Sequence, residues 1–232
     1  MRVAVGTSGF AYKEWKGSFY PPDLKDPDML RFYAGRFRTV EINNTFYRMP
    51  TTKVLEGWAS QVPEDFTFVL KASQRITHQK RLKDAGEEVA YFTRTATTLG
   101  ERLGPTLVQL PPNLKKDLPR LEGFLASLPD GWRAAFEFRH ASWYEEDVYA
   151  ALRARNQSLC VADTDDAESQ VVATADWGYL RLRRAAYSPA DLAAWAQRVQ
   201  SQAWREAFVF FKHEDAGAGP ALAAAFIAAC EV

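Results

Sequence analysis

The 232-residue sequence has only two cysteines, Cys160 and Cys230, which lie far apart and have no CxxC spacing. This excludes a disulfide framework and a cysteine-based redox or zinc motif, and we interpret both as buried free thiols of a reducing compartment. No apolar run approaches the length of a membrane span, and the N-terminus is too polar for a signal peptide. We therefore expect a cytoplasmic protein that does not contact a membrane.

An excess of charge of either sign is also missing, because 29 Lys and Arg residues balance 29 Asp and Glu residues. A global attraction to nucleic acid is therefore excluded, and any such attraction must come from a local patch. The sequence contains no P-loop, no Ser–His–acid elbow, no zinc-finger spacing and no GxGxxG after its first strand signal. Its 47% hydrophobic content is enough for a large core, which excludes disorder.

Eight short segments carry strand signals, and helical patterns follow most of them. The predicted strands are Val3–Val5, Thr39–Asn44, Phe66–Ser73, Thr106–Leu110, Ala134–Arg139, Ser158–Ala162, Gly178–Arg183 and Ala207–Lys212. The predicted helices run from Asp28 to about Phe37, from Thr51 or Thr52 to about Gln61, and over Glu87–Gly104, Leu118–Leu128, Glu145–Arg155, Pro189–Gln200 and Pro220–Cys230. Alternating strands and helices indicate a parallel sheet with right-handed crossovers.

Eight such units favour an α/β fold of the (β/α)8 TIM-barrel type over an open doubly wound sheet. No linker divides the chain, so residues 1–232 are predicted to form a single domain. Between Asp163 and Trp177 there is no convincing helical pattern. The predicted barrel therefore lacks the helix after its sixth strand.

The segment RAAFEFRHASWY, residues 133–144, carries charges where a buried strand would carry Val or Ile. Phe136 and Phe138 alternate with Glu137 and Arg139, which places the two charged residues on one face. Strands with the sequences VEIN and YLRLR repeat this alternation. In TIM barrels the functional groups lie at the C-terminal ends of the strands, so these charges predict a site there.

The candidate site consists of polar residues at those strand ends. The catalytic candidates are Glu137 and Glu41 as an acid/base pair, Asp163 to orient a base, and His140; the ligand-binding candidates are Thr7, Ser8, Asn43, Lys71, Gln109, Arg139, Trp143, Arg181, Arg183 and Lys212. Buried charges must be paired, so we expect the three acids to meet the bases Lys71, Arg139, Arg181 and Lys212. Basic groups exceed acidic groups in this set, which favours a small anionic or phosphorylated ligand.

A structural network of ion pairs is the alternative to a ligand site. For one pair such as Glu137 and Arg139 the two interpretations are equally good. For the whole set function is favoured, because a structural barrel fills these layers with Val, Ile and Leu. An enzyme of hydrolase, isomerase or lyase type is the resulting hypothesis, and the sequence predicts no oligomeric state.

A metal centre would need clustered ligands, and the sequence has only three histidines. His140, His213, Asp163 and Glu137 are the residues that could converge on one divalent ion. A hydrogen-bonded or surface histidine is the commoner explanation, so no metal and no cofactor are predicted. The turn Gly6–Gly9 could hold an anion on its backbone N–H groups, or be a tight turn that requires glycine.

Nucleic acid is the rival partner. The predicted loop HQKRLK at 78–83 is basic, and an early loop supplies Tyr12, Trp15, Phe19 and Tyr20 as possible stacking surfaces. A solvated basic loop over a hydrophobic plug is the simpler interpretation of the same residues.

Seven motifs together resemble the DUF72 family, also called the YecE-like proteins. They are GTSGF at 6–10, VEINNTFYR at 40–48, FVLKAS at 68–73, LVQLPP at 107–112, FEFRHASWY at 136–144, ATADWGYLRLR at 173–183 and GPALAAAF at 219–226. The resemblance covers the whole chain and implies a TIM-barrel-like fold, but no activity, because the family is defined by a domain of unknown function. A looser similarity of fold to xylose isomerase-like and endonuclease-type barrels implies sugar phosphate or DNA ligands by analogy only.

Two positions depart from the family pattern. After YLRL the family usually has His-Gly, where this chain has Arg183 and Arg184; at the last strand it usually has an Asn-rich ending, where this chain has Lys212, His213 and Glu214. These changes make the predicted pocket more cationic than the family pattern.

Overall fold

The computed structural model describes residues 1–166 and 170–231 and has eight parallel strands at its centre. The strands are β1 (Arg2–Thr7), β2 (Thr39–Ile42), β3 (Thr67–Lys71), β4 (Leu103–Gln109), β5 (Ala134–Glu137), β6 (Ser158–Asp163), β7 (Trp177–Leu182) and β8 (Glu206–Phe211). Their order is β1-β8-β7-β6-β5-β4-β3-β2. Sequential strands are neighbours throughout, and β1 also pairs with β8, so the predicted TIM-type barrel is confirmed.

The barrel closes between β1 and β2 through a single bridge rather than a continuous ladder. Ser8 pairs with Glu41, and the Gly9 N–H donates to the Glu41 carbonyl oxygen at 2.7 Å. A side chain completes the seam: the Tyr33 hydroxyl accepts from the Thr7 N–H at 2.9 Å and donates to a backbone carbonyl of β2 at 3.0 Å. The barrel is therefore nearly closed.

Gly6 is required at this seam because the backbones of β1 and β2 approach closely. A Cβ atom at Gly6 would lie 2.1 Å from the Thr39 carbonyl oxygen, which no side chain can tolerate. The N–H groups of Thr7, Ser8 and Gly9 all donate to protein acceptors. These N–H groups are therefore not available to an anion, and the structure favours the second interpretation, a tight turn that requires glycine.

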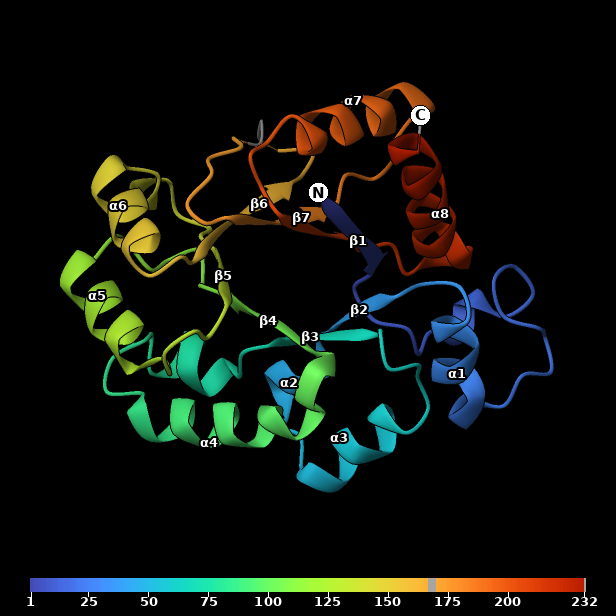
Figure 1. The fold of residues 1–232 in the computed structure, drawn as a ribbon, viewed down its shortest axis with the longest axis horizontal. Coiled ribbons are helices and arrows are strands. Elements are labelled where there is room, and N and C mark those ends of the chain that lie inside the picture. The colour runs from blue at the N-terminus through green and yellow to red at the C-terminus, as the bar shows by residue number, and fades with distance from the viewer. Residues whose placement is uncertain (167–169, 232) are drawn as a thin grey trace.

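Helices surround the ring of strands (Figure 1). They are α1 (Met29–Ala34), α3 (Thr52–Ala59), α4 (Gly86–Ala96), α5 (Leu118–Ser127), α6 (Glu146–Ala154), α7 (Pro189–Gln200) and α8 (Ala218–Cys230), with a short helix α2 (Asn44–Tyr47) after β2. Ser188 forms a capping box with Asp191 at the start of α7, and the Thr51 hydroxyl accepts from the Val54 N–H at the start of α3. Both caps follow from the sequence.

Three local predictions were wrong. The predicted helix over Glu87–Gly104 ends at Ala96, because a 3-10 turn follows and Gly104 already belongs to β4. The segment 45–48 lies outside every predicted helix, yet most of it belongs to α2. The basic loop begins within a π-helical turn, Arg75–Gln79, and continues through two residues with positive φ, Arg81 and Leu82.

The connection from β6 to β7 contains no helix in residues 164–166 and 170–176, in agreement with the prediction. Residues 167–169, which that prediction also covers, lie outside the described residues. Within the part of the chain that the structure describes, no helix is both long and apolar enough to cross a membrane.

The barrel interior has two parts. Its apolar part includes Trp177, Tyr179, Phe208 and Phe210, which pack against small or aliphatic residues of the other strands. Because side chains alternate along a strand, Arg181 follows Tyr179 on the same face, one step nearer the C-terminal end. A charged layer therefore lies above an aromatic plug, at the end of the barrel where TIM-type folds bear their sites.

Candidate active site at the C-terminal end of the barrel

Arg181 on β7 joins two glutamates from other strands. Its Nη2 lies 2.9 Å from Glu41 Oε1 on β2, and its Nη1 lies 2.6 Å from Glu137 Oε2 on β5. The side chains of all three residues are at most 2% exposed. Of the predicted ion pairs, these two are the buried ones, and they cross the barrel interior.

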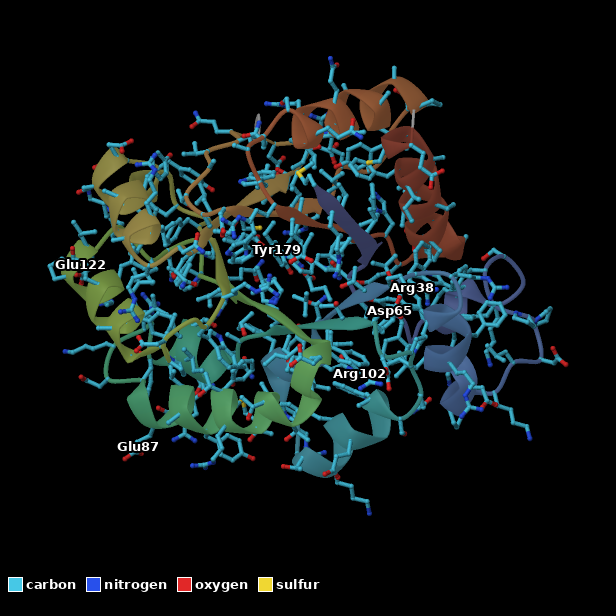
Figure 2. The ribbon with its side chains drawn as sticks, viewed as in Figure 1. Arg38, Asp65, Glu87, Arg102, Glu122 and Tyr179 are labelled. Carbon is cyan, nitrogen blue, oxygen red and sulfur yellow. The ribbon has the colours of Figure 1, made fainter. Side chains whose placement is uncertain are left out.

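Glu41 is surrounded by further donors. Tyr179, labelled within the ring of strands in Figure 2, donates its hydroxyl to Glu41 Oε2 at 2.6 Å. The Asn43 amide donates to Glu41 Oε1 at 3.2 Å. The buried Ser8 hydroxyl helps to lower the pKa of Glu41, although its Oγ forms no hydrogen bond of normal geometry. Glu41 is therefore held by protein groups on both carboxylate oxygens.

A second arm of the network runs from Glu137 to Lys71. The Gln109 amide nitrogen donates to Glu137 Oε1 at 2.8 Å, and the Gln109 amide oxygen accepts from Lys71 Nζ at 2.9 Å. Arg183 adds a weaker contact, with its Nη1 3.4 Å from Glu137 Oε1. Hydrogen bonds and ion pairs thus connect side chains of β2, β3, β4, β5 and β7 in one layer.

Both glutamates are ionised in this network. Burial alone would raise the pKa of each carboxyl, but the Arg181 guanidinium and the hydrogen-bond donors together outweigh burial and lower both pKa values from the ordinary value of Glu. Neither carboxyl can therefore act as a general acid near neutral pH. The acid role that the sequence predicted for this pair is unsupported, while a base role remains a prediction.

Lys71 differs from the other cations of the layer. Burial and, after it, the positive charge of Arg181 lower its pKa to about 8, against the opposing effect of the two glutamates. Its ammonium also lies 4.3 Å from the centre of the Phe46 ring. Lys71 is therefore the group in the layer whose pKa lies nearest neutrality, the range suited to proton transfer.

A cavity of about 600 Å³ opens beside this layer, between β5 and β6. Glu137, Arg139, Tyr144, Thr164 and Arg183 are among the residues that line it. Arg139 is exposed, and no described residue pairs with its guanidinium. Its charged lining therefore comprises two carboxylates, Glu137 and Asp166, and two guanidinium groups, Arg139 and Arg183.

A larger groove of about 680 Å³ lies between α8 and the segment around Phe37, and Phe19, Phe37 and Ile227 contribute to its lining. Its one charged lining residue is Arg36. Because it has one charged side chain, this groove is a weaker candidate for an active site than the smaller cavity between β5 and β6.

Asp163 does not join the central network. It lies on β6 facing the helix layer, where its Oδ2 accepts from the Tyr187 hydroxyl at 2.9 Å and from Trp195 Nε1 at 3.1 Å. Arg184 lies 3.0 Å from the same oxygen. The expected pairing with Lys71, Arg139, Arg181 or Lys212 is not the arrangement seen, because Asp163 is on the opposite face of its strand from the barrel interior.

Trp143 is fully buried and does not face the cavity. Its ring stacks on Phe138 with centroids 4.7 Å apart, and its Nε1 donates to the Leu114 carbonyl oxygen at 2.7 Å. The ligand-binding role predicted for Trp143 is therefore replaced by a packing role. His140 caps a 3-10 turn through Nδ1, which accepts from the Ser142 N–H at 3.2 Å.

The remaining predicted residues are placed as follows. The Thr7 hydroxyl donates to the Gly9 carbonyl oxygen at 2.6 Å, so it is engaged locally. Lys212 is exposed and lies 3.9 Å from Glu214, and its charge contributes to lowering the pKa of Lys71. His213 Nε2 lies 2.6 Å from the Arg184 carbonyl oxygen. The predicted site is thus divided: Glu41, Asn43, Lys71, Gln109, Glu137, Arg181 and Arg183 meet, and Thr7, His140, Trp143 and Asp163 do not.

Sequence reasoning missed Tyr179 as a member of the network. The signal was available, because Tyr179 precedes Arg181 by two positions on a strand and shares its face. A tyrosine in a buried strand is more often a core residue, and only the 2.6 Å contact with Glu41 shows its second role.

The aromatic rim expected for nucleic acid is packed into the protein. Trp15 and Tyr20 are at most 2% exposed, and Phe19 lies among other rings. In the basic segment, Arg75 and Lys80 both pair with Glu88. Exposed aromatic residues near this region are Tyr47 on α2, at 73%, and Tyr91 on α4, at 42%. No group of three or more His, Cys, Asp or Glu among residues 1–166 and 170–231 has the geometry of a metal site.

Taken together, the fold and this layer define a TIM-barrel protein with a charged network across the C-terminal end of the barrel. The family model described as "Protein of unknown function DUF72" matches residues 4–232, and the chain belongs to that family. Its resemblance to the DUF72 pattern is therefore confirmed.

Relatives of the chain carry no activity in their names. UPF0759 protein YecE of Escherichia coli K12 is 31% identical over 141 residues, which are 58% of this chain and 52% of that protein. UPF0759 protein YunF of Bacillus subtilis is 28% identical over 63% of this chain and 54% of its own length. The chain thus matches about half the length of these curated relatives.

Two solved structures have the same fold over the whole chain. A DUF72 family protein from Thermotoga maritima has a TM-score of 0.86 and 30% identity, with 100% of both chains covered. A DUF72 family protein from Enterococcus faecalis has a TM-score of 0.83 and 20% identity, covering 99% of this chain and 96% of its own.

Proposed function

We propose that this protein is an enzyme that binds a small anionic ligand, such as a phosphorylated metabolite, at the C-terminal end of the barrel and acts on it by proton transfer. The observation that carries the proposal is the β5–β6 cavity, where Arg139 and Arg183 face an ionised Glu137. Arginine forks bind phosphate and carboxylate groups in bidentate fashion.

The charges around the cavity support an anion. Arg181 balances one of the two negative charges of Glu41 and Glu137. Lys71, Arg139 and Arg183 together carry more positive charge than the remaining carboxylate and Asp166 at the cavity can balance. The positive charges also act on His78, because burial and the charges of Lys71 and Arg139 lower the pKa of its imidazole. An anionic group would relieve this repulsion.

Within this proposal the residues have different tasks. Glu137 lines the cavity and serves as the base, and Lys71, linked to it through Gln109, provides the second proton-transfer group. Glu41 is no longer a good catalytic candidate, because protein donors engage both of its oxygens. It instead fixes the position of Arg181.

The test is a thermal-shift screen of a metabolite library on the wild type and on Glu137→Gln and Arg139→Ala, each first checked for folding. We expect hits rich in phosphate and carboxylate groups, with the shift reduced by Arg139→Ala. If both variants fold and keep the wild-type ligand profile, the proposed site is wrong.

Nucleic acid is the second candidate partner, and the exposed Tyr47 is the observation in its favour. The proposal predicts retardation of single-stranded oligonucleotides at low salt, with a steep loss as salt rises. Tyr47→Ala would weaken this binding, because base stacking contributes about 1–3 kcal/mol per base. Absence of retardation at low salt would remove this candidate.

A further inference from the structure

Lys71 is a buried amine without an acidic partner. The residue is 9% exposed, its Nζ donates to the neutral amide oxygen of Gln109 at 2.9 Å, and its other close contact is the Phe46 ring. No carboxylate among the described residues forms an ion pair with it. Lysine is almost never buried without a counterion, so this arrangement needs an explanation.

The Lys71 ammonium contacts neutral groups, an amide oxygen and an aromatic ring, instead of an acid. Gln109 stands between its ammonium and Glu137, so the acid that could have paired with Lys71 is held one side chain away. A direct contact would stabilise the ammonium form, whereas an amide acceptor and an aromatic face stabilise it less. The arrangement therefore favours a reactive neutral amine over a structural ion pair.

We propose that Lys71 is a nucleophile that forms an imine with a small aldehyde or ketone bearing a phosphate or carboxylate group. This inference rests on the proposed function, because the cations at the end of the barrel would hold the anionic part of the substrate. Arg183 and Lys212 follow the C-terminal ends of β7 and β8, on the same end of the barrel as Lys71.

The chemistry is balanced without an oxidant or reductant. The neutral Nζ attacks the carbonyl carbon, an N–C bond forms, and the electron pair of the C=O bond moves to oxygen. A proton passes from nitrogen to that oxygen to give a carbinolamine. The hydroxyl then takes a proton from solvent and leaves as water, and a cationic imine remains. Glu41 and Glu137, whose charges favour a cation at Nζ, stabilise this imine as they do the ammonium.

The amine is available near neutral pH. Burial lowers its pKa to about 8, whereas an ordinary lysine has a pKa of about 10.4. At pH 8 roughly half of Lys71 is neutral, against less than about one part in 100 of a surface lysine. Lys71 should therefore react with carbonyl compounds at least about tenfold faster than exposed lysines, even after its lower basicity reduces its nucleophilicity.

The test traps the imine by reduction. The protein is incubated at pH 8 with glycolaldehyde phosphate, glyoxylate or uncharged glycolaldehyde, sodium cyanoborohydride is added, and the adduct is located by peptide mass spectrometry. We expect labelling of Lys71 at least about tenfold above that of the exposed Lys25 and Lys53. Lys71→Gln should abolish this label, and Lys25→Gln should leave it unchanged. Comparison of glycolaldehyde phosphate with glyoxylate shows whether a phosphate or a carboxylate group is preferred.

A second measurement needs no variant and so does not depend on folding of Lys71→Gln. Labelling of Lys71 in the wild type should reach half its maximum near pH 8, the pKa of its amine. Labelling that increases only toward pH 10, or that is equal at Lys71 and the surface lysines, overturns the inference.

The outcomes separate this inference from the proposed function. If phosphorylated ligands bind in the thermal-shift screen but no reduced adduct forms on Lys71, the imine is excluded and the anion site stands. If glycolaldehyde labels Lys71 as fast as its phosphate ester, the nucleophile is supported and the anionic substrate is rejected.

Discussion

The Arg181 guanidinium lies 2.6 Å from Glu137 Oε2, deep in the barrel, and its other nitrogen is bonded to Glu41. One arginine thus compensates two buried carboxylates from opposite parts of the ring of strands. Removal of this cation leaves Glu41 without an ion pair and Glu137 with only the longer contact to Arg183.

Arg181→Met should therefore be strongly destabilising. We expect the free energy of unfolding to fall by about 3–5 kcal/mol, the usual effect of breaking a buried ion pair from one side. Arg183→Met is the matched control, because Arg183 is 26% exposed and 3.4 Å from Glu137, so its loss should be below about 1 kcal/mol. Denaturant unfolding of both variants measures the difference, and equal losses would contradict the account.

The same network predicts a response to acid. The pKa values of Glu41 and Glu137 are below the ordinary value of 4.5 in the folded protein, so the unfolded chain binds more protons as pH falls. Their stabilising contribution is complete above pH 4.5 and is lost as pH falls through the folded pKa values. The unfolding free energy should therefore decrease more steeply below pH 4.5 in the wild type than in the triple variant E41Q/E137Q/R181M. Parallel curves between pH 5 and 3 would disprove this.

Lys71 predicts the opposite behaviour in alkali. Its pKa is lowered to about 8 from 10.5, so the ammonium is disfavoured in the folded state and that cost disappears as pH rises. Between pH 8 and 10.5 the wild type should gain up to about 3 kcal/mol of unfolding free energy relative to Lys71→Met. The difference between the two proteins is the measured quantity, because buried tyrosines titrate in both. A constant difference over this range would show that the amine is not perturbed.

Substitution of Trp143 tests whether this residue of the segment 133–144 contributes to ligand binding or only to stability. Trp143→Phe keeps the stack on Phe138 but leaves the Leu114 carbonyl oxygen without its donor, at a cost of about 1–3 kcal/mol. The affinity for an anionic ligand should change less than about twofold, because the ring does not line the cavity. A loss of affinity without a loss of stability would restore the ligand-binding role.

The sequence predicted the eight strands, the barrel and the charged face shared by Glu41, Glu137 and Arg181, because period-two alternation fixes which side chains point inward. It could not predict which acid meets which base. Asp163 is one residue beyond an inward position on β6, so it faces α7 and binds Trp195 instead. A shift of one residue reverses the face, and the end of a strand is the least certain feature of a sequence pattern.

Arg139 is a second residue whose position the alternation did not predict correctly. It has the alternation of Glu137, but β5 ends at Glu137, so the backbone no longer keeps Arg139 in the barrel interior. It lies at the rim instead, exposed and lining the cavity. Tyr179 and Gln109 were recognisable as inward residues, but their hydrogen bonds depend on side-chain geometry that only the assembled barrel provides.

Arg139, which lines the cavity, is proposed to bind an anion, and one affinity measurement tests this directly. The dissociation constant of the best phosphorylated ligand from the screen is compared, by calorimetry, for the wild type, Arg139→Ala and the control Arg205→Ala. Arg205 is 86% exposed at the start of β8, at the opposite end of the barrel. We predict at least about tenfold weaker binding for Arg139→Ala, from loss of a charge-assisted contact of about 1.5–3 kcal/mol, and unchanged binding for Arg205→Ala. Equal affinity of all three proteins would contradict the account.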